Sequence, residues 1–226
     1  MRAKLSEAVR IYSKAARYCS RTGLDQEVQF QRDANFEIFT ETDLLRESAW
    51  VILCSGFRES TVRRLFDYIS LCFCDWESAK AIVDADPACR LAAIKGFGNS
   101  RKVDAIANVA FTIVQLGFDS MKWAIHSNPI DGLQRFPFIG KVTSYHLAKN
   151  LGLDVAKPDR HLVRLASRIG FESAHELCES IARSVGESTR VVDLVLWRYL
   201  ADAPQIGLRK GADSDQQKVH DDVTGT

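Results

Sequence analysis

The chain has 226 residues, of which 46% are hydrophobic and 26% are charged, and its formal net charge is +1 at pH 7. This length and composition predict a compact folded protein with one large core or two smaller lobes. No stretch approaches the roughly 20 consecutive apolar residues that span a bilayer, and residues 1–5 lead into an amphipathic stretch rather than a signal-peptide core. We therefore expect a cytoplasmic, monomeric protein that has no association with a membrane.

Helical periodicity dominates the chain. Thr40 and Asp43 are capping candidates ahead of residues 44–53, whose apolar residues are dense enough to predict a buried helix. Gly and Pro residues mark the ends of further helices, which are expected at 61–73, 76–85, 89–95, 102–116, 121–127, 142–151, 161–169, 174–185 and 188–200. Short strands are plausible at 28–30 and 36–39 alone. Residues 204–226 are polar and lack apolar periodicity, which predicts a disordered tail.

The cysteines give no sign of a metal site. They are scattered without paired-ligand spacing, at Cys19, Cys54, Cys72, Cys74, Cys89 and Cys178. We interpret them as reduced residues, mostly in the core, and expect neither a metal nor any other cofactor.

Basic residues concentrate in one part of the chain. Between residues 131 and 170 there are seven Lys/Arg and three Asp/Glu, a local net charge of +4, whereas the remainder has a net charge of −3. A basic face of this kind favours binding to a phosphate backbone, although a solvated helix surface would give the same count.

The basic segment contains a tight turn directly before a helix. Pro137 and Gly140 lie in this turn, ahead of the helix expected at 142–151. The unpaired N-terminal amides of such a helix bind anions, and phosphate is the natural ligand. Lys141 and Thr143, in the first turn, would add a charge and a hydroxyl group. Contacts of this kind hold a nucleic-acid backbone without reading its sequence.

Asp159 is the candidate catalytic carboxylate. Gly152 ends the hairpin helix, and an extended stretch through Pro158 returns the chain to the start of the next helix. Cleaving the bond between a base and deoxyribose develops positive charge on the sugar. An ionised carboxylate stabilises that charge and orients or deprotonates the attacking water. The alternative is that Asp159 only caps the helix that begins at Arg160 or His161.

Three separated motifs resemble one known family. Residues 136–140 (Phe-Pro-Phe-Ile-Gly) and 158–161 (Pro-Asp-Arg-His) resemble the Leu-Pro-Gly-Val-Gly and Val-Asp-x-His signature of the helix-hairpin-helix (HhH-GPD) DNA glycosylases. That superfamily includes endonuclease III, the adenine glycosylase that acts on mispairs and the 8-oxoguanine glycosylases. Residues 94–106 resemble its Gly-x-x-x-Lys-Ala-x-x-Ile helix start, and residues 50–62 its first buried helix and wedge loop. Order and spacing agree over roughly residues 45–170.

The resemblance implies an all-α, two-lobed fold with a helix-hairpin-helix DNA-binding motif and an active-site cleft between the lobes. Residues 46–150 would form a barrel-like helical lobe that ends in the helix-hairpin-helix, and residues 1–45 with 151–203 would form the second lobe. Asp159 matches the catalytic aspartate of the family. The implied backbone-binding residues are Phe138, Gly140, Lys141 and Thr143. The implied partner is double-stranded DNA with a damaged or modified base.

The hairpin departs from the family at two positions. Bifunctional members carry a nucleophilic lysine two residues after the second hairpin glycine, where this chain has Val142. Lys141 is one residue early, which rotates its side chain by about 100° around the helix. We therefore expect a monofunctional enzyme that uses water, with lyase activity through Lys141 or another lysine as an alternative. Phe138 replaces the first hairpin glycine and would be strained at positive φ, or would stack against DNA.

The wedge loop also differs from the family. An ungapped match puts Gly56 where the family often has a glutamine that fills the gap left by a flipped base. Phe57 or Arg58 could fill this gap, or could make ordinary helix-end contacts. Asp193 lies in an apolar run, where a carboxylate needs a partner. Base-pocket candidates, each open to an ordinary core or surface role, are Lys102, Tyr145, Trp76 and Trp123.

These features predict a DNA N-glycosylase that flips out a damaged or modified base, excises it hydrolytically and leaves an abasic site. The sequence does not identify the base, so oxidised, alkylated, deaminated and mispaired bases all stay open. The role would be base excision repair, or defence against phage DNA with bulky modified bases, which the small Gly56 would accommodate. The alternative class is a non-catalytic helix-hairpin-helix module that binds nucleic acid, for which the setting of Asp159 has no purpose.

Overall fold

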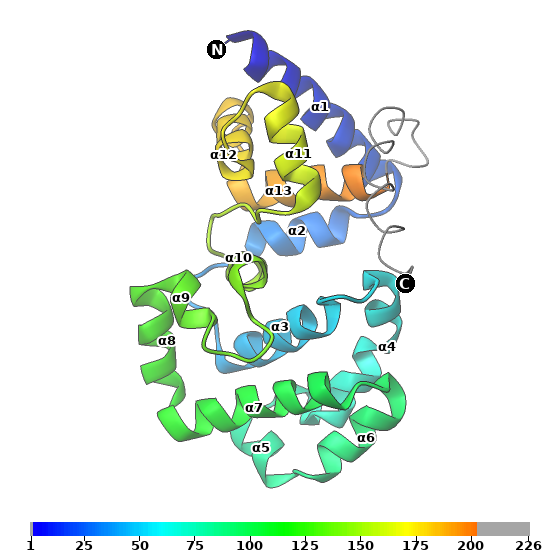
Figure 1. Ribbon diagram of the computed structural model, residues 1–226, viewed down its shortest axis with the longest axis vertical. Helices are drawn as coiled ribbons and strands as arrows, with labels where there is room; N and C mark the ends of the chain where they lie inside the picture. The colour runs from blue at the N-terminus through cyan, green and yellow to red at the C-terminus, as the bar shows by residue number, and fades with distance from the viewer. Residues whose placement is uncertain (1, 203–226) are drawn as a thin grey trace, which may run out of the picture.

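A computed structural model of the protein describes residues 2–202 (Figure 1), and within this range all regular secondary structure is helical. The helices are α1 (Arg2–Arg21), α2 (Asp25–Asp33), α3 (Glu41–Cys54), α4 (Glu59–Cys72), α5 (Ala79–Asp84), α6 (Ala88–Phe97), α7 (Ser100–Leu116), α8 (Phe118–Ser127), α9 (Pro129–Leu133), α10 (Lys141–Asn150), α11 (Arg160–Ile169), α12 (Ala174–Val185) and α13 (Thr189–Ala201). The predicted all-α class is therefore confirmed. The predicted disordered tail, 204–226, lies outside the described residues.

Both predicted strands are wrong. Residues 28–30 lie inside α2, where Asp25 and Glu27 favour the helix N-terminus and Val28 packs on the core one turn after Leu24. Residues 36–38 form a turn, and no strand is present at 36–39. Two apolar residues at alternate positions in each segment were too short a pattern to separate a strand from a helix.

The helix predicted at 76–85 is interrupted. Cys74–Trp76 form a 3₁₀ turn in which Asp75 and Trp76 have positive φ, and α5 begins only at Ala79. The hydroxyl of Ser78 accepts a hydrogen bond from the backbone N–H of Ala81 and caps this new start. A local capping signal therefore overrides the helical periodicity.

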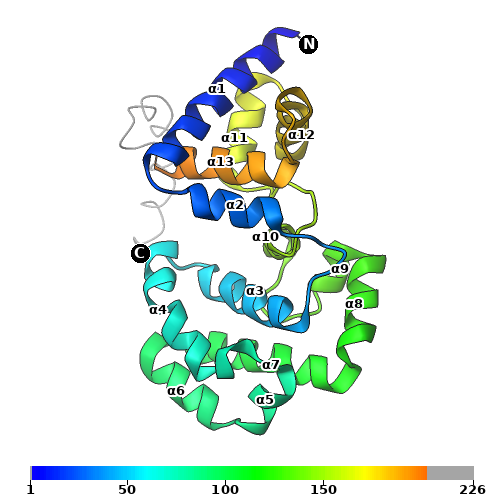
Figure 2. The ribbon, with the colours of Figure 1, turned by 180° about the vertical axis from the view of Figure 1, so that it is seen from behind.

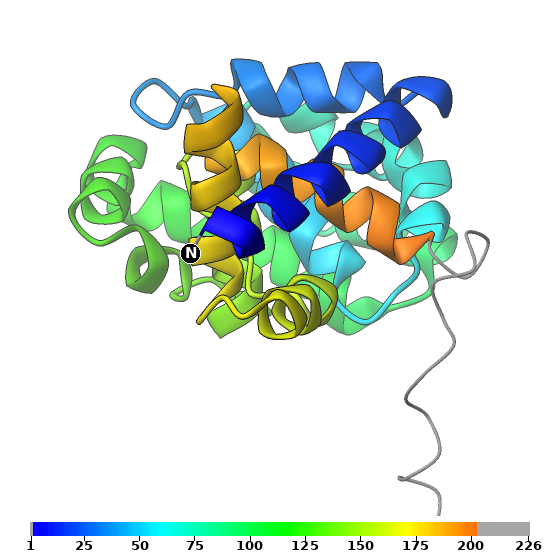
Figure 3. The ribbon, with the colours of Figure 1, turned by 90° about the horizontal axis from the view of Figure 1, so that it is seen from above.

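Two hydrophobic clusters form the core. The larger one gathers buried residues from 36 to 151, and the smaller one gathers residues from 8 to 19 and from 156 to 199. In Figure 1, α1 and α11–α13 lie at one end of the long axis and α3–α9 at the other, with α10 between them. Seen along that axis, α1 crosses α13 (Figure 3). Helix α1 contacts both α13 and α12.

The boundary between these clusters differs from the predicted lobes at the N-terminal side. Phe36, Phe39, Leu44 and Leu45 pack in the larger cluster, although residues 1–45 were expected in the second lobe. We propose a boundary near residue 34, between α2 and α3. Phe36 and Phe39 belong to the first lobe because their rings pack against His126 of α8.

Helix α3 is the buried central helix of the first lobe. Its N-cap is Thr40, whose hydroxyl accepts from the N–H of Asp43 while the Asp43 carboxylate accepts from the N–H of Thr40. The helix lies between α10 and α7 (Figure 2) and contacts both. Leu44, Ile52 and Leu53 are fully buried, so the predicted buried helix is confirmed.

No helix within residues 2–202 combines the length and the apolar character that crossing a membrane requires.

Candidate active site

The hairpin before α10 is held by its own side chains. Phe136 and Ile139 are buried in the core, while Phe138 between them is 40% exposed and has φ of 63°. The hydroxyl of Thr143 accepts a hydrogen bond from the N–H of Gly140 at 2.7 Å and donates to the carbonyl of Phe138 at 3.2 Å. Phe138 therefore does adopt a backbone conformation that disfavours a β-carbon, at a position where the related motif has glycine.

The start of α10 leaves hydrogen-bond donors free. Within residues 2–202 the backbone amides of Lys141, Val142 and Thr143 have no acceptor. Gly140 has extended backbone angles, and a β-carbon added there would meet no atom within 4 Å. The helix therefore presents an open, electropositive end to which an anion can approach closely.

Asp159 both caps α11 and lines a cavity. Its Oδ1 accepts a hydrogen bond from the N–H of His161 at 2.9 Å, as the capping interpretation predicted. Its Oδ2 lies 3.9 Å from the Nζ of Lys157, and both side chains are about four-fifths buried. One carboxylate oxygen is thus used for the cap, and the other faces a cation in the cavity wall.

The cavity has a volume of about 720 Å³ and is walled by both lobes. Its residues come from α2, α3, the loop between α3 and α4, α4, α10, the extended stretch before α11, and α13. This size lies within the range of about 300–1,000 Å³ that is typical of small-molecule sites. Five aromatic side chains contribute to the lining: Phe30, Trp50, Phe57, Phe66 and Trp197.

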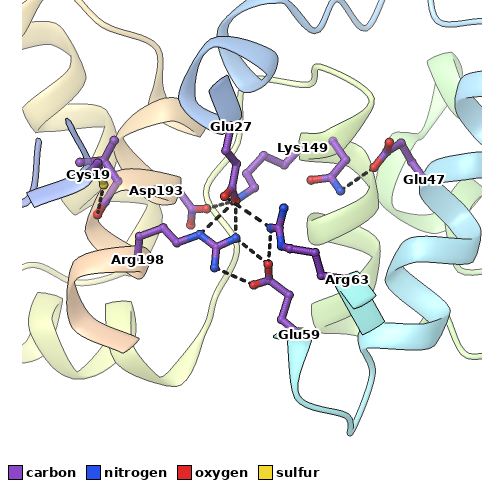
Figure 4. Close-up of polar contacts among 10 residues, drawn as sticks. Cys19, Glu27, Glu47, Glu59, Arg63, Lys149, Asp193 and Arg198 are labelled. Carbon is purple, nitrogen blue, oxygen red and sulfur yellow. Dashed lines mark hydrogen bonds and ion pairs between the residues drawn. The ribbon is translucent and has the colours of Figure 1, made fainter. Parts of the chain in front are cut away.

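A network of four charged side chains joins the two lobes at the cavity wall. Arg198 of α13 donates to Glu27 of α2 at 3.0 Å and to Glu59, the first residue of α4, at 2.8 Å (Figure 4). Arg63 of α4 completes the network by its contacts with both carboxylates. Burial opposes ionisation of Glu59, but the hydrogen bonds and charges of the two arginines outweigh it and hold its pKa below the usual value.

A second ion pair lies deeper between the same lobes. The ammonium of Lys149, on α10, contacts the carboxylate of Asp193, on α13, and both side chains are buried. The other Asp193 oxygen accepts from the backbone N–H of Lys157 at 3.0 Å. The partner that the sequence required for Asp193 is therefore Lys149.

His146 shares this part of the wall. Burial, followed by the positive charges of Lys157, Lys149 and Arg198, places the pKa of His146 well below its usual value. The imidazole is therefore neutral near neutral pH, and it can act as both a hydrogen-bond donor and an acceptor toward a bound base.

The predicted site residues divide into two groups. Asp159, Thr143, Gly56 and Phe57 line the cavity together, and Val142 of the first α10 turn lies in the same wall. Phe138, Gly140 and Lys141 lie at the hairpin, outside the cavity. Arg58, the N-cap of α4, and Tyr145, within α10, do not line it either.

Lys102 does not line the cavity. Its ammonium is buried at the end of α3, where it donates to the carbonyls of Ile52, Leu53 and Ser55. The same ammonium lies 5.3 Å from the ring centres of Phe57 and Phe138. Lys102 therefore stabilises the wedge loop, through Ser55 and Phe57, and the hairpin, through the ring of Phe138.

The two tryptophans considered for the base pocket lie elsewhere. Trp76 is buried in the core, stacks on Phe73 and donates to the hydroxyl of Ser70, whereas Trp123 is 73% exposed on α8. The tryptophans of the cavity are Trp50 and Trp197. Which tryptophans line the cavity depends on how the helices pack, and helical spacing in the sequence alone does not determine it.

All six cysteines are free, and three of them are buried. Within residues 2–202 no three His, Cys, Asp or Glu side chains gather in a way that could hold a metal ion.

Sequence reasoning missed several residues of the cavity. His146 carried a usable signal, because it lies one turn after Val142 on the same face of α10. Trp197, Arg198 and Glu27 carried none, since α13 lies far along the chain from α2, and Trp50 was placed only in a buried helix and not in the cavity.

The fold resembles that of a solved enzyme. The crystal structure of the 8-oxoguanine DNA glycosylase of Thermotoga maritima matches with a TM-score of 0.56 at 20% sequence identity, over 88% of this chain and 97% of the other. No protein-family model matches the chain, and no curated protein matches its sequence. The structural likeness confirms the helix-hairpin-helix glycosylase fold that the three motifs predicted.

Proposed function

We propose that the protein is a DNA N-glycosylase, which extrudes a damaged or modified base from double-stranded DNA and hydrolyses its bond to deoxyribose. The observation that carries this proposal is that Asp159 and the first turn of α10, with Val142 and Thr143, share the wall of one interlobe cavity. An anion held at the start of α10 would therefore lie beside a carboxylate and an opening large enough for an extruded nucleotide. The fold shared with an 8-oxoguanine DNA glycosylase supports the same reaction class.

Asp159 would act on the sugar. As the bond to the base breaks, positive charge develops at C1′, and an ionised carboxylate close to that atom lowers the energy of the transition state. The same carboxylate orients a water molecule and accepts its proton, so that hydroxide is delivered to C1′. The N–H of His161 holds one Asp159 oxygen in place.

Water, rather than a hairpin lysine, would displace the base. Val142 occupies the position of the nucleophilic lysine in the related bifunctional enzymes, and its side chain has no amine. Lys141 is exposed and does not line the cavity. The first turn of α10 therefore offers no amine nucleophile to the sugar.

The cavity supports binding of a base by stacking and by hydrogen bonds. Trp50 and Trp197 offer aromatic faces, and the neutral His146 offers a polar edge. A volume of about 720 Å³ exceeds what one unmodified base needs, which is compatible with repair of common lesions and with defence against phage DNA that carries bulky bases. The excised base is therefore best sought in a panel that spans both groups.

The test measures the released base itself. Wild type, Asp159→Asn and the control Asp119→Asn are incubated with duplexes that carry oxidised, alkylated, deaminated or mispaired bases, and with phage DNA that carries modified bases. Free base is measured by mass spectrometry. Asn also caps helices well, so Asp159→Asn removes the charge and keeps the cap. Asp119 is exposed on α8.

We expect one substrate class to be processed by wild type and by Asp119→Asn, and release by Asp159→Asn to fall by about 10²–10⁴-fold. DNA binding without base release across the whole panel would replace the proposal with a non-catalytic DNA-binding module. Undiminished release by Asp159→Asn would remove Asp159 from the reaction.

A further inference from the structure

Two thiol groups outside the cavity lie in direct contact. The Sγ of Cys74, in the 3₁₀ turn after α4, is 3.9 Å from the Sγ of Cys89 on α6. The turn joins α4 to α5, and α6 packs on α4 (Figure 2). Cys89 is buried, whereas Cys74 is half-buried. The reaction proposed above uses neither thiol, so the contact between them has no role in it.

The contact depends on an unusual backbone. Cys74, Asp75 and Trp76 have φ of 54°, 49° and 62°, and few non-glycine residues adopt this left-handed region. Strained segments persist where the surrounding structure holds them, and they cluster at functional positions. Here the ring of Trp76 stacks on Phe73 and its Nε1–H donates to the hydroxyl of Ser70. This packing holds the turn, and the turn places the Cys74 thiol against α6.

The two thiols have different surroundings. Burial, followed by the neighbouring Cys74, raises the pKa of Cys89 to about 11, so Cys89 stays protonated near neutral pH. Its side chain is also closed to small oxidants, because the residue is only 5% exposed. Cys74 can be reached from solvent, and its Sγ lies 3.7 Å from the carbonyl oxygen of Ala81. An oxidant would therefore meet Cys74 first and leave Cys89 to react with the product.

We propose that Cys74 and Cys89 form a redox site, at which a small peroxide oxidises the pair to a reversible disulfide. Bonded sulfur atoms are about 2.05 Å apart, so a small side-chain movement from the observed contact is sufficient. The inference does not rest on the proposed function, since neither cysteine lines the interlobe cavity.

The reaction balances with hydrogen peroxide as the oxidant. The thiolate of Cys74 attacks one peroxide oxygen, the O–O bond breaks and hydroxide leaves, which converts Cys74 to a sulfenic acid. The sulfur of Cys89 then attacks the Cys74 sulfur, the S–O bond breaks, and the hydroxyl group leaves with the Cys89 proton as water. Two thiols and one peroxide thus give one disulfide and two waters. A reducing thiol restores both cysteines by exchange.

The disulfide would protect the packing around the turn. Trp76 also stacks against Phe66, which lines the cavity together with Trp50. Further oxidation of Cys74 to a sulfinic or sulfonic acid is irreversible and would add a charge at the edge of this core. The disulfide is uncharged and reversible. Cys89 therefore acts as the resolving thiol that stops the oxidation of Cys74 at a recoverable stage.

The test is a peptide map of the wild-type protein after exposure to hydrogen peroxide. Remaining thiols are blocked with N-ethylmaleimide, and trypsin then gives peptide 65–80, which contains Cys74, and peptide 81–90, which contains Cys89. Peptide 65–80 also contains Cys72, so tandem mass spectrometry is used to locate the linked residue. Cys72→Ser is the matched control, and Cys89→Ala removes the resolving thiol.

We expect the two peptides to be joined through Cys74 and Cys89 in wild type and in Cys72→Ser, and to separate when dithiothreitol is added. In Cys89→Ala, Cys74 should instead accumulate the sulfinic and sulfonic acids. Absence of the linked peptides from wild type, or linkage of Cys89 to Cys72, would overturn the inference. Because the decisive map is made on wild type, the result does not depend on the folding of either variant.

Discussion

The ammonium of Lys149 and the carboxylate of Asp193 form a buried ion pair between α10, which follows the hairpin, and α13 of the second lobe. Asp193 also accepts from the backbone N–H of Lys157, two residues before Asp159. A single carboxylate therefore fixes the hairpin helix relative to the segment that carries the candidate catalytic residue. The Lys149–Asp193 pair therefore helps to set the distance between the free amides at the start of α10, where a phosphate would bind, and the Asp159 carboxylate. The proposed chemistry depends on this distance.

Removing one member of this pair is expected to be costly. In Lys149→Met the Asp193 charge stays buried without its partner, and we expect the free energy of unfolding to fall by about 3–5 kcal/mol. Urea denaturation followed by circular dichroism measures this. The double variant Lys149→Met/Asp193→Asn removes the buried charge and keeps an acceptor for Lys157, so it should recover much of the loss. Equal instability of the single and double variants would contradict this role.

Lys102 is expected to contribute to stability and to DNA binding together. Lys102→Met leaves the carbonyls at the end of α3 without their donor, which should cost about 1–3 kcal/mol in the free energy of unfolding. The rings of Phe57 and Phe138 lose the cation between them, so affinity for duplex DNA should also fall. The control is Lys95→Met, at an exposed position of α6. Wild-type stability of Lys102→Met would refute the capping role.

Lys141 is expected to contact a phosphate rather than a base. In Lys141→Ala the slope of log affinity against log salt concentration should decrease in magnitude by about 1, independently of DNA sequence. Fluorescence anisotropy over a salt series provides the slopes. Lys14→Ala, at an exposed position of α1 in the other lobe, should leave the slope unchanged. Equal slopes for wild type and Lys141→Ala would place this lysine away from the DNA.

Gly140 is expected to matter for DNA and not for folding. Its backbone is extended and a β-carbon would meet no protein atom, so Gly140→Ala should change stability by less than about 0.5 kcal/mol. The added methyl group would stand where a phosphate approaches the free amides of α10, and Kd should rise. The contrasting variant is Gly132→Ala, whose β-carbon would lie 3.0 Å from Cα of Ile125, so it should lose stability instead. Unchanged DNA affinity of Gly140→Ala would locate the phosphate elsewhere.

His146 is expected to make stability depend on pH. Because its folded-state pKa is depressed, protonation favours the unfolded chain, whose histidine titrates near about 6.5. The contribution of the neutral imidazole is fully present above that pH and is lost as the pH falls below it. Unfolding free energies measured at about pH 7.5 and about pH 5.5 should differ less in His146→Gln than in wild type. The same pH dependence in both proteins would contradict a neutral His146.

Local patterns were sufficient for much of the fold. Thr40 and Asp43 form the predicted capping box, the dense apolar run after them is the buried helix α3, and the hairpin precedes α10 as expected. Phe138 has the positive φ that its place in the motif implied. Caps, turns and helix faces are determined by neighbours within about four residues, so they can be read from the sequence.

The sequence by itself determined most of the helices after residue 40, the hairpin motif and the position of Asp159 at the start of α11. Only the tertiary structure decided which side chains share the cavity with that carboxylate. Glu27 and Arg198 are separated by 171 positions, and Lys149 and Asp193 by 44, yet each pair is in direct contact. Such contacts depend on how whole helices pack, and the free energy of that packing is spread over many apolar side chains that carry no local signature of their eventual partners.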